Sequence, residues 1–224
     1  MLKARKRITK RQIKEDKFVT FYFKAVDFLK ENMNKVTIGL VVVLAIIILV
    51  MLFRQSKKTA ELNASVQLAK ANSEIAHGQY QQTIDILLNM INNYSGTSSA
   101  SRGVYLLAHT YFQNGEYENA ITYFKKYLDD YGNDPILTSG AYSGLGACYE
   151  QLGKLSDAAQ AYENGATKFA GSFEAPQQLM NAARCYALEN RFADAKNCYE
   201  KVIEQYPKSD LKSDAELFLA KLKG

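Results

Sequence analysis

The pattern of hydrophobic and polar positions changes twice along the chain. Residues Val36–Phe53 form a run of eighteen residues without a charge. Before this run, apolar residues recur from Lys17 at steps of three or four, the spacing of one helical face. After it, small, large and aromatic residues recur with a step of 37 or 38 residues. The chain is therefore predicted to be all-α, with three regions of different character.

The uncharged run has the length of a membrane-spanning helix. At about 1.5 Å per residue it extends roughly 27 Å, close to the ~30 Å hydrocarbon core of a bilayer. A cleaved signal peptide has a shorter basic lead and a small-x-small cleavage site, which residues 50–56 lack. The sequence predicts a transmembrane helix at residues 36–53 that acts as an uncleaved signal anchor.

Charge is distributed unequally around this span. Residues 1–35 contain eleven basic and four acidic residues, whereas the chain from Arg54 onwards contains seventeen basic and nineteen acidic. Basic residues near a span stay on the cytoplasmic side. Arg54, Lys57 and Lys58 oppose this orientation but are outnumbered. The N-terminus is predicted to be cytoplasmic and the part after the span extracytoplasmic.

The predicted cytoplasmic arm, residues 1–35, contains an amphipathic stretch next to the span. Its apolar stripe is Phe18, Tyr22, Val26, Leu29 and Met33, with Lys17, Lys24 and Lys30 beside it. Such a helix lies in the membrane interface, so residues 1–53 are expected to contact lipid, anionic lipid in particular. The alternative is a docking arm for a cytoplasmic or membrane partner. Because a basic run alone does not identify nucleic acid, nucleic acid is not an expected partner.

Turn residues mark four repeats after the span. They are Gly78, Gly115, Gly153 and Asn190, at steps of 37, 38 and 37. Glycine and asparagine both tolerate the left-handed conformation that ends a helix, so the exchange at the fourth position fits the alignment. Four helix–turn–helix units are predicted.

Other positions keep the same register. Small residues precede the turns at Ala71, Ala108, Gly146 and Ala183, and short residues follow them at Thr83, Ala120, Ala158 and Ala195. Large apolar residues come four positions later, at Leu87, Phe124, Tyr162 and Tyr199, and the units close on Tyr94, Tyr131, Phe169 and Tyr206. The small residues are expected where two helices touch, and the large ones between units.

These residues resemble the tetratricopeptide repeat (TPR). The second unit matches closely through Leu107, Ala108, Tyr111, Gly115 and Tyr117, with Ala120 and Phe124. The first unit is degenerate, since Lys70 and Glu74 replace an apolar residue and a tyrosine. The resemblance implies a TPR-like α-solenoid over residues 64–224, joined to the span by a helical linker at residues 54–63.

The tail continues the register. Ala220 lies 37 residues after Ala183, and Ser209 with Asp210 can cap a helix over residues 211–222. A solenoid needs a terminal helix with one apolar side. Leu217, Leu219 and Ala220 are expected to face the last repeat.

Signatures of chemistry are missing from the sequence. It contains neither a zinc-protease H-E-x-x-H nor a phosphate-binding glycine loop, and His77 and His109 fall in different repeats. Cys148, Cys185 and Cys198 do not have metal-site spacing. We expect the cysteines to be small buried residues. The alternative is a disulfide between Cys185 and Cys198, which would need a suitable Cα–Cα distance. No enzyme activity, cofactor or metal is predicted.

In TPR proteins the first helices of the units line a peptide-binding groove. By resemblance the groove here contains Leu68, Asn72, Ile75, Arg102, Tyr105, His109, Phe112, Ser143, Ala147, Glu150, Gln177, Met180, Arg184 and Leu188. Tyr105 and Met180 stand where the carboxylate-binding TPR groove has a lysine. We expect Tyr105, Phe112, Met180 and Leu188 to form an exposed apolar surface suited to an apolar peptide. The alternative is that several of these residues only pack between repeats.

The whole arrangement resembles the ancillary subunit family of the bacterial SecYEG translocon. It implies a single-pass protein of the bacterial inner membrane with periplasmic TPR units, whose partners are the Sec translocon, secreted chains or envelope chaperones. This implication is an analogy from architecture. An alternative is an envelope scaffold of the outer-membrane-assembly or Tol–Pal type, whose members have a lipid anchor or cleaved signal instead of residues 36–53. A mitochondrial receptor would have the basic arm on the other side.

Overall fold

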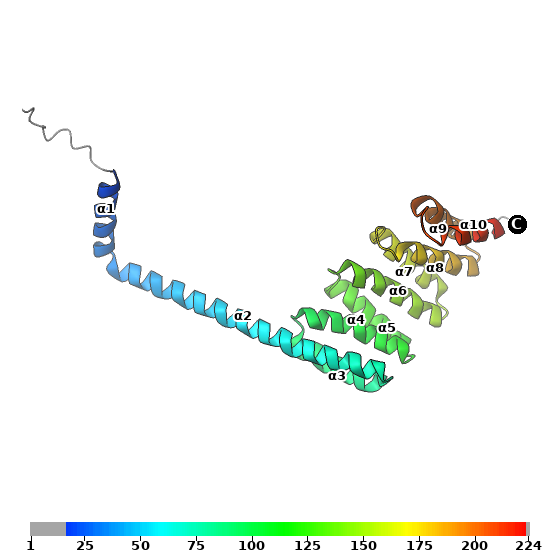
Figure 1. The fold of residues 1–224 in the computed structure, drawn as a ribbon, viewed down its shortest axis with the longest axis horizontal. Coiled ribbons are helices and arrows are strands. Elements are labelled where there is room, and N and C mark those ends of the chain that lie inside the picture. Colours follow the sequence, from blue (N-terminus) through cyan, green and yellow to red (C-terminus); the bar gives the residue numbers. More distant parts are fainter. Residues whose placement is uncertain (1–16, 223–224) are drawn as a thin grey trace, which may run out of the picture. The chain divides into compact units, whose positions relative to one another are not determined.

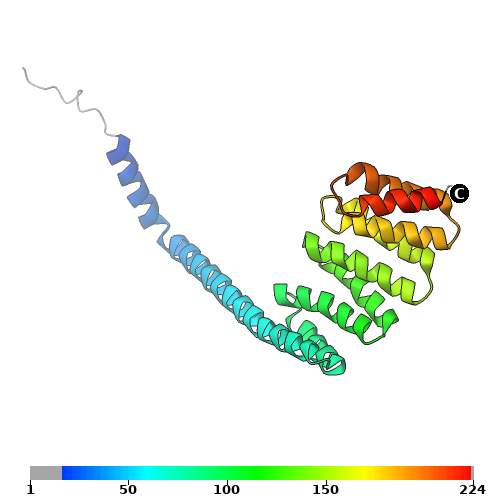
Figure 2. The ribbon, with the colours of Figure 1, turned by 45° about the vertical axis from the view of Figure 1, so that its right-hand side comes forward.

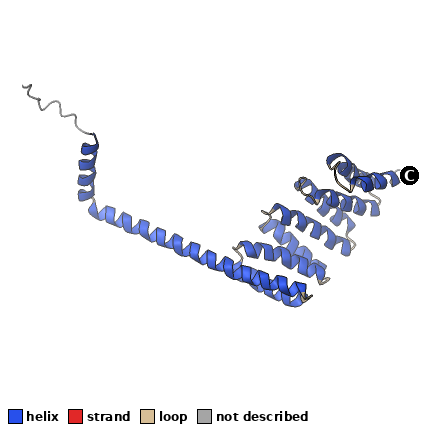
Figure 3. Cartoon of the chain, in the orientation of Figure 1, coloured by secondary structure: helices blue, strands red, loops and turns tan. Residues whose placement is uncertain are grey.

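The computed structural model describes residues 17–222, with side chains from Thr20 onwards. In this part every regular element is a helix (Figures 1 and 3). The helices are α1 (Lys17–Glu31), α2 (Met33–Ala76), α3 (Tyr80–Tyr94), α4 (Ser98–Gln113), α5 (Tyr117–Asp130), α6 (Pro135–Gln151), α7 (Leu155–Lys168), α8 (Ala175–Leu188), α9 (Phe192–Gln205) and α10 (Lys212–Lys221). The first sixteen residues of the predicted arm, and the side chain of Phe18, lie outside the described residues.

Helix α2 crosses the boundary between two compact units, residues 1–56 and 57–224. It is long and apolar enough to cross a membrane. The large apolar side chains from Ile38 to Phe53 are all between 45% and 66% exposed. Among the described residues, none of the large apolar side chains from Ile38 to Leu52 is buried, as expected of a membrane-spanning helix that is hydrophobic all round.

Helix α1 has a broader apolar surface than the predicted stripe. Tyr22, Leu29 and Met33 are exposed as expected, but Phe21, Phe23 and Phe28 are exposed as well. The helix ends before Asn32, whose side-chain amide donates a hydrogen bond to the Phe28 carbonyl at 3.1 Å. Most of the surface of α1 is therefore apolar and lacks a protein partner among the described residues.

Residues 57–222 form a solenoid in which consecutive helices pack on one another (Figure 2). Helices α4 and α6 also touch, as do α6 and α8. We call α4, α6, α8 and α10, with the part of α2 after Ser56, the first-helix layer. Helices α3, α5, α7 and α9 are the second-helix layer. The predicted helix–turn–helix units are confirmed.

The four predicted turns adopt one conformation. Gly78, Gly115, Gly153 and Asn190 have φ of 71°, 79°, 70° and 61°. The N–H of the next residue donates to a carbonyl five residues earlier, at 3.0, 2.9, 2.9 and 2.9 Å. These are the backbone bonds that close a helix in the Schellman motif. Asn190 is the one non-glycine residue with positive φ in the described chain.

The register of small and large residues is also confirmed. Thr83, Ala120, Ala158 and Ala195 have no exposed surface, and Leu87, Phe124, Tyr162 and Tyr199 are buried. At Gly146 an added Cβ would lie 2.7 Å from the Tyr162 ring, so only glycine lets α6 approach α7 this closely. Small residues thus set the spacing within units, as expected from close packing.

Contacts of α2 with the solenoid begin inside the predicted linker, residues 54–63. The Glu61 carboxylate accepts hydrogen bonds from the Ser98 and Ser99 N–H groups at 2.7 and 3.0 Å, and from the Ser99 hydroxyl at 2.6 Å. These N–H groups belong to the first turn of α4, where no intrahelical partner exists. Glu61 therefore links α2 to the next first helix.

Helix α10 confirms the predicted terminal helix and part of its predicted face, since Leu219 is half-buried and packs against the second core cluster. Leu217 is 52% exposed and Ala220 is exposed, whereas Ala215 is fully buried. Phe218 stacks on Tyr199 with ring centroids 5.9 Å apart. The register explains the error: Gly146, two steps before Ala220, touches the second helix of its own unit. No second helix follows α10 in the described chain, so that face lacks a partner.

Candidate functional site

The described residues contain neither a metal-ligand cluster nor a cysteine that could act as a nucleophile. Residues 17–222 hold no group of three or more His, Cys, Asp or Glu that could bind a metal ion. Cys148, Cys185 and Cys198 are free and buried, so Cys185 and Cys198 are not bridged. Burial raises the pKa of each thiol to about 12. A thiol that stays protonated at neutral pH is a poor nucleophile.

The predicted groove residues on α2 lie apart from the cavities described below. Leu68 is half-buried and packs against the first core cluster. The Asn72 side-chain amide donates to the Leu68 carbonyl at 3.0 Å, and Ile75 is half-buried. These three residues serve packing and helix hydrogen bonding in the free chain.

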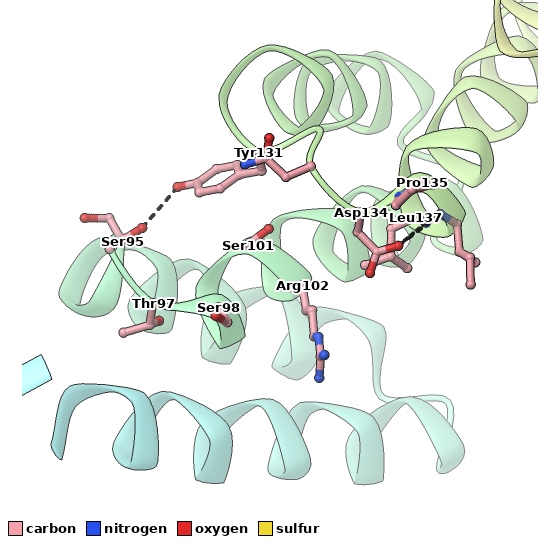
Figure 4. Close-up of a pocket in the computed structure, with 12 residues that line it drawn as sticks. Ser95, Thr97, Ser98, Ser101, Arg102, Tyr131, Asp134, Pro135 and Leu137 are labelled. Atoms are coloured by element: carbon pink, nitrogen blue, oxygen red, sulfur yellow. Dashed lines mark hydrogen bonds between the residues drawn. The ribbon is translucent and has the colours of Figure 1, made fainter. Parts of the chain in front are cut away.

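Arg102 lines a cavity of about 750 Å³ at the edge of the solenoid, between the α3–α4 and α5–α6 connections (Figure 4). Here the Tyr131 hydroxyl donates to the Ser95 carbonyl at 3.4 Å. Asp134 caps α6 by accepting from the Leu137 N–H at 3.2 Å. Arg102 is exposed and is thus separated from the other groove residues of α4.

Tyr105, His109 and Phe112 line one pocket of about 270 Å³. We call it the α4–α6 pocket. Its opposite wall is formed by the small residues Gly140, Ser143, Gly144 and Ala147 of α6, with Phe124 and Glu174 completing the lining. The rings of Tyr105 and His109 are 5.1 Å apart, and those of His109 and Phe124 are 5.5 Å apart.

Met180, Arg184 and Leu188 line a second cavity, of about 560 Å³, shared with α10. We call it the α8–α10 pocket. Its other lining residues are Gln177, Asn181, Ala187, Tyr199, Leu211, Asp214, Phe218, Lys221 and Leu222. Met180 is only 8% exposed, contrary to the expectation of an exposed side chain, because it belongs to the second core cluster. Leu188 is 59% exposed, as expected.

Arg184, which lines the α8–α10 pocket, forms an ion pair with Glu150 of α6. Arg184 Nη2 donates to both carboxylate oxygens of Glu150, at 2.8 and 2.6 Å. The arginine of α8 is thus paired with α6 and is not a free cation. Hydrogen bonds between charged groups are stronger than those between neutral groups, so this pair links α8 to α6.

The repeat pattern is shared with known families. A family described as "Tetratricopeptide repeat-like domain" matches residues 26–138, and one described as "Tetratricopeptide repeat" matches residues 179–209. The first match covers half of the chain. This chain belongs to the tetratricopeptide repeat-like family.

Solved TPR structures share the fold of this TPR-like chain. MamA is 18% identical, with a TM-score of 0.55, and the match covers 65% of this chain and 80% of that protein. A tetratricopeptide repeat protein from Parabacteroides merdae is 14% identical, with a TM-score of 0.59, covering 72% and 60%. A putative kinesin light chain from Podosopora anserina with TPR-like repeats is 17% identical, with a TM-score of 0.52, covering 66% and 76%. No curated protein matches the chain.

TPR-like domains typically act as non-catalytic scaffolds, so this family assignment implies protein partners. Within the domain, sequence reasoning missed two parts of the candidate surface. One is the α10 residues, which the 37-residue register could have identified, since α10 takes the place of a fifth first helix. The other is Glu174, the last residue of the α7–α8 connection, which has no signal in the repeat pattern.

Proposed function

We propose that this chain is a membrane-anchored protein-interaction module of a bacterial cell envelope, which binds apolar polypeptide segments on its first-helix layer. The main observation that supports this proposal is the α8–α10 pocket. Its volume of about 560 Å³ is within the range of ligand sites. Leu188 and Phe218 remain 59% and 41% exposed there. Aromatic and aliphatic side chains that a partner buries dominate binding energies.

The polar groups around this pocket favour a polypeptide over a small apolar molecule. Gln177 and Asn181 bond to each other at 3.1 Å on the exposed side of α8. Lys221 lies 5.4 Å from the centre of the Phe218 ring, and Asp214 completes the rim. An apolar centre with a polar rim is the usual anatomy of a protein interface.

The membrane part of the proposal is supported by the exposed apolar stretch of α2 and by the charge difference around it. Eleven basic residues precede the span, and this excess supports a cytoplasmic N-terminus and a periplasmic solenoid. Helix α1 would lie in the cytoplasmic interface, its wide apolar surface covered by lipid. Of the partners implied by this architecture, we favour the protein translocon, secreted chains and envelope chaperones.

Site-specific photocrosslinking in intact cells tests the proposal. A photoreactive amino acid replaces Leu188, and a matched probe replaces Gln160, an exposed residue of α7 in the second-helix layer. We expect the Leu188 probe to capture translocon subunits, secreted chains or envelope chaperones, and the Gln160 probe to capture few of them. Equal capture from both positions would show that the α8–α10 pocket is not the binding surface. Capture of cytoplasmic proteins alone would refute the proposed topology.

A further inference from the structure

The α4–α6 pocket differs from the α8–α10 pocket in the arrangement of its walls. Its first wall is aromatic, from Tyr105, His109 and Phe112 of α4, with the fully buried Phe124 behind it. Its second wall on α6 is formed by residues no larger than serine. An added Cβ at Gly140 would lie 2.6 Å from the Tyr105 hydroxyl, and one at Gly144 would overlap the Phe124 ring. The glycines of α6 therefore let the Tyr105 and Phe124 rings pack directly against its backbone. Tyr105, His109 and Phe112, which are half-buried, form the aromatic lining that a ligand can reach.

The charge of this pocket is negative. Glu174 is the one carboxylate in its lining, and no lysine or arginine lines it. The Ser139 hydroxyl donates to Glu174 Oε2 at 3.2 Å, which holds the carboxylate at the start of α6. Desolvation lowers the pKa of His109, so its ring is neutral at pH 7. Burial, together with the nearby Glu174 charge, raises the pKa of Tyr105 and keeps its hydroxyl protonated.

We propose that the α4–α6 pocket receives an arginine side chain of the bound polypeptide. The guanidinium would lie against the aromatic wall and pair with Glu174. This inference rests on the proposed function, since it concerns the same first-helix layer, and it adds a preference for apolar segments that contain an arginine.

Size and chemistry both favour this occupant. A volume of about 270 Å³ is below the range of pockets for drug-sized ligands and suits a single side chain. Cations bind over aromatic faces, and the effect grows when the site is desolvated. Arginine is preferred to lysine because its planar guanidinium stacks on rings and matches a carboxylate in two hydrogen bonds. Ser143, whose hydroxyl accepts from Gln178 Nε2 at 2.7 Å, adds a polar group beside Glu174.

Binding of matched peptides to the full chain in lipid nanodiscs tests the inference. The probes are short fluorescent peptides of alternating leucine and serine with one central arginine, and the same peptides with norleucine or glutamate at that position. We expect the arginine peptide to bind about tenfold more tightly than the norleucine peptide, which is within the range that cation–aromatic contacts give. The glutamate peptide should bind more weakly than both.

Glu174→Gln is the decisive variant, because the amide oxygen can still accept from Ser139 while the charge is removed. It should reduce the arginine preference, measured as the ratio of the affinities of the arginine and norleucine peptides, to about twofold. Glu118→Gln, on the exposed face of α5, is the matched control and should keep the full preference. Equal affinity of the arginine and norleucine peptides for the wild-type chain would overturn this inference and leave the proposed function standing. If no peptide binds, the proposed function fails, and the inference with it.

Discussion

The two halves of α2 are parts of one helix with opposite requirements. From Ile38 to Phe53 every large apolar side chain is exposed, on all sides of the helix. After residue 56, Ala64 and Ala71 have no exposed surface, while Leu62 and Val66 are 64% and 58% exposed. One half carries apolar residues all round, and the other presents a single narrow face to protein. The comparison shows that one continuous helix can carry two distributions of apolar residues. The distribution all round the helix is typical of a membrane span, and the distribution on one narrow face is typical of a helix that packs on protein.

The largest expected effect is on membrane retention, after two arginines are introduced into the apolar half of α2. Val43→Arg with Ile47→Arg places two charges one helical turn apart in the apolar half, at a cost of about 3 kcal/mol each at the centre of a bilayer. We expect loss of membrane retention in alkaline carbonate extraction. Leu62→Arg with Val66→Arg has the same spacing in the second half and should leave retention unchanged. If both pairs behave alike, the distinction between the two halves is wrong.

Larger side chains at the buried small residues test the packing of the second half of α2 and of the solenoid. Ala71→Leu should reduce the free energy of unfolding by about 1–3 kcal/mol, because the site is fully packed. Ala120→Leu and Ala158→Leu, at fully buried positions after the turns, should do the same. Ala45→Leu in the apolar half is the control. The measurement is thermal unfolding of the full chain in detergent, followed by circular dichroism, and an unchanged melting curve for Ala71→Leu would contradict the register.

The smallest expected effect concerns Glu61, the side chain that links α2 to α4. Its hydrogen bond with the Ser99 hydroxyl, the largest contribution, and those from the Ser98 and Ser99 N–H groups lower its pKa in the folded chain. The carboxylate therefore contributes stability above its unfolded pKa, and this contribution is lost as the pH falls through the lowered folded value. Glu61→Gln should destabilise the chain by about 1 kcal/mol at pH 7, as loss of a helix cap does.

Chemical denaturation at pH 7 and at acidic pH checks this expectation. The difference between wild type and Glu61→Gln should shrink in acid, where the wild-type carboxyl is protonated. Glu204→Gln, at an exposed position of α9, is the control. A difference that is independent of pH would show that shape, and not charge, decides the contribution of Glu61.

The sequence by itself determined the features that depend on local backbone geometry and on repetition. The four turns, with positive φ at Gly78, Gly115, Gly153 and Asn190, follow from which residues tolerate that conformation. The buried small residues follow from their recurrence at a fixed step. The uncharged length of residues 36–53 likewise predicted a helix able to cross a membrane.

Only the tertiary structure decided how residues from different units meet. Glu61 bonds to residues 37 and 38 positions away, and Glu174 joins the α4–α6 pocket from beyond α7. The predicted groove is divided between an edge cavity at Arg102, a pocket at Tyr105 and a pocket at Leu188. Leu217 and Ala220 are exposed although both were expected to face the last repeat. The physical reason is that burial depends on whether a neighbouring helix is present, and α10 has no following helix among the described residues to cover this face.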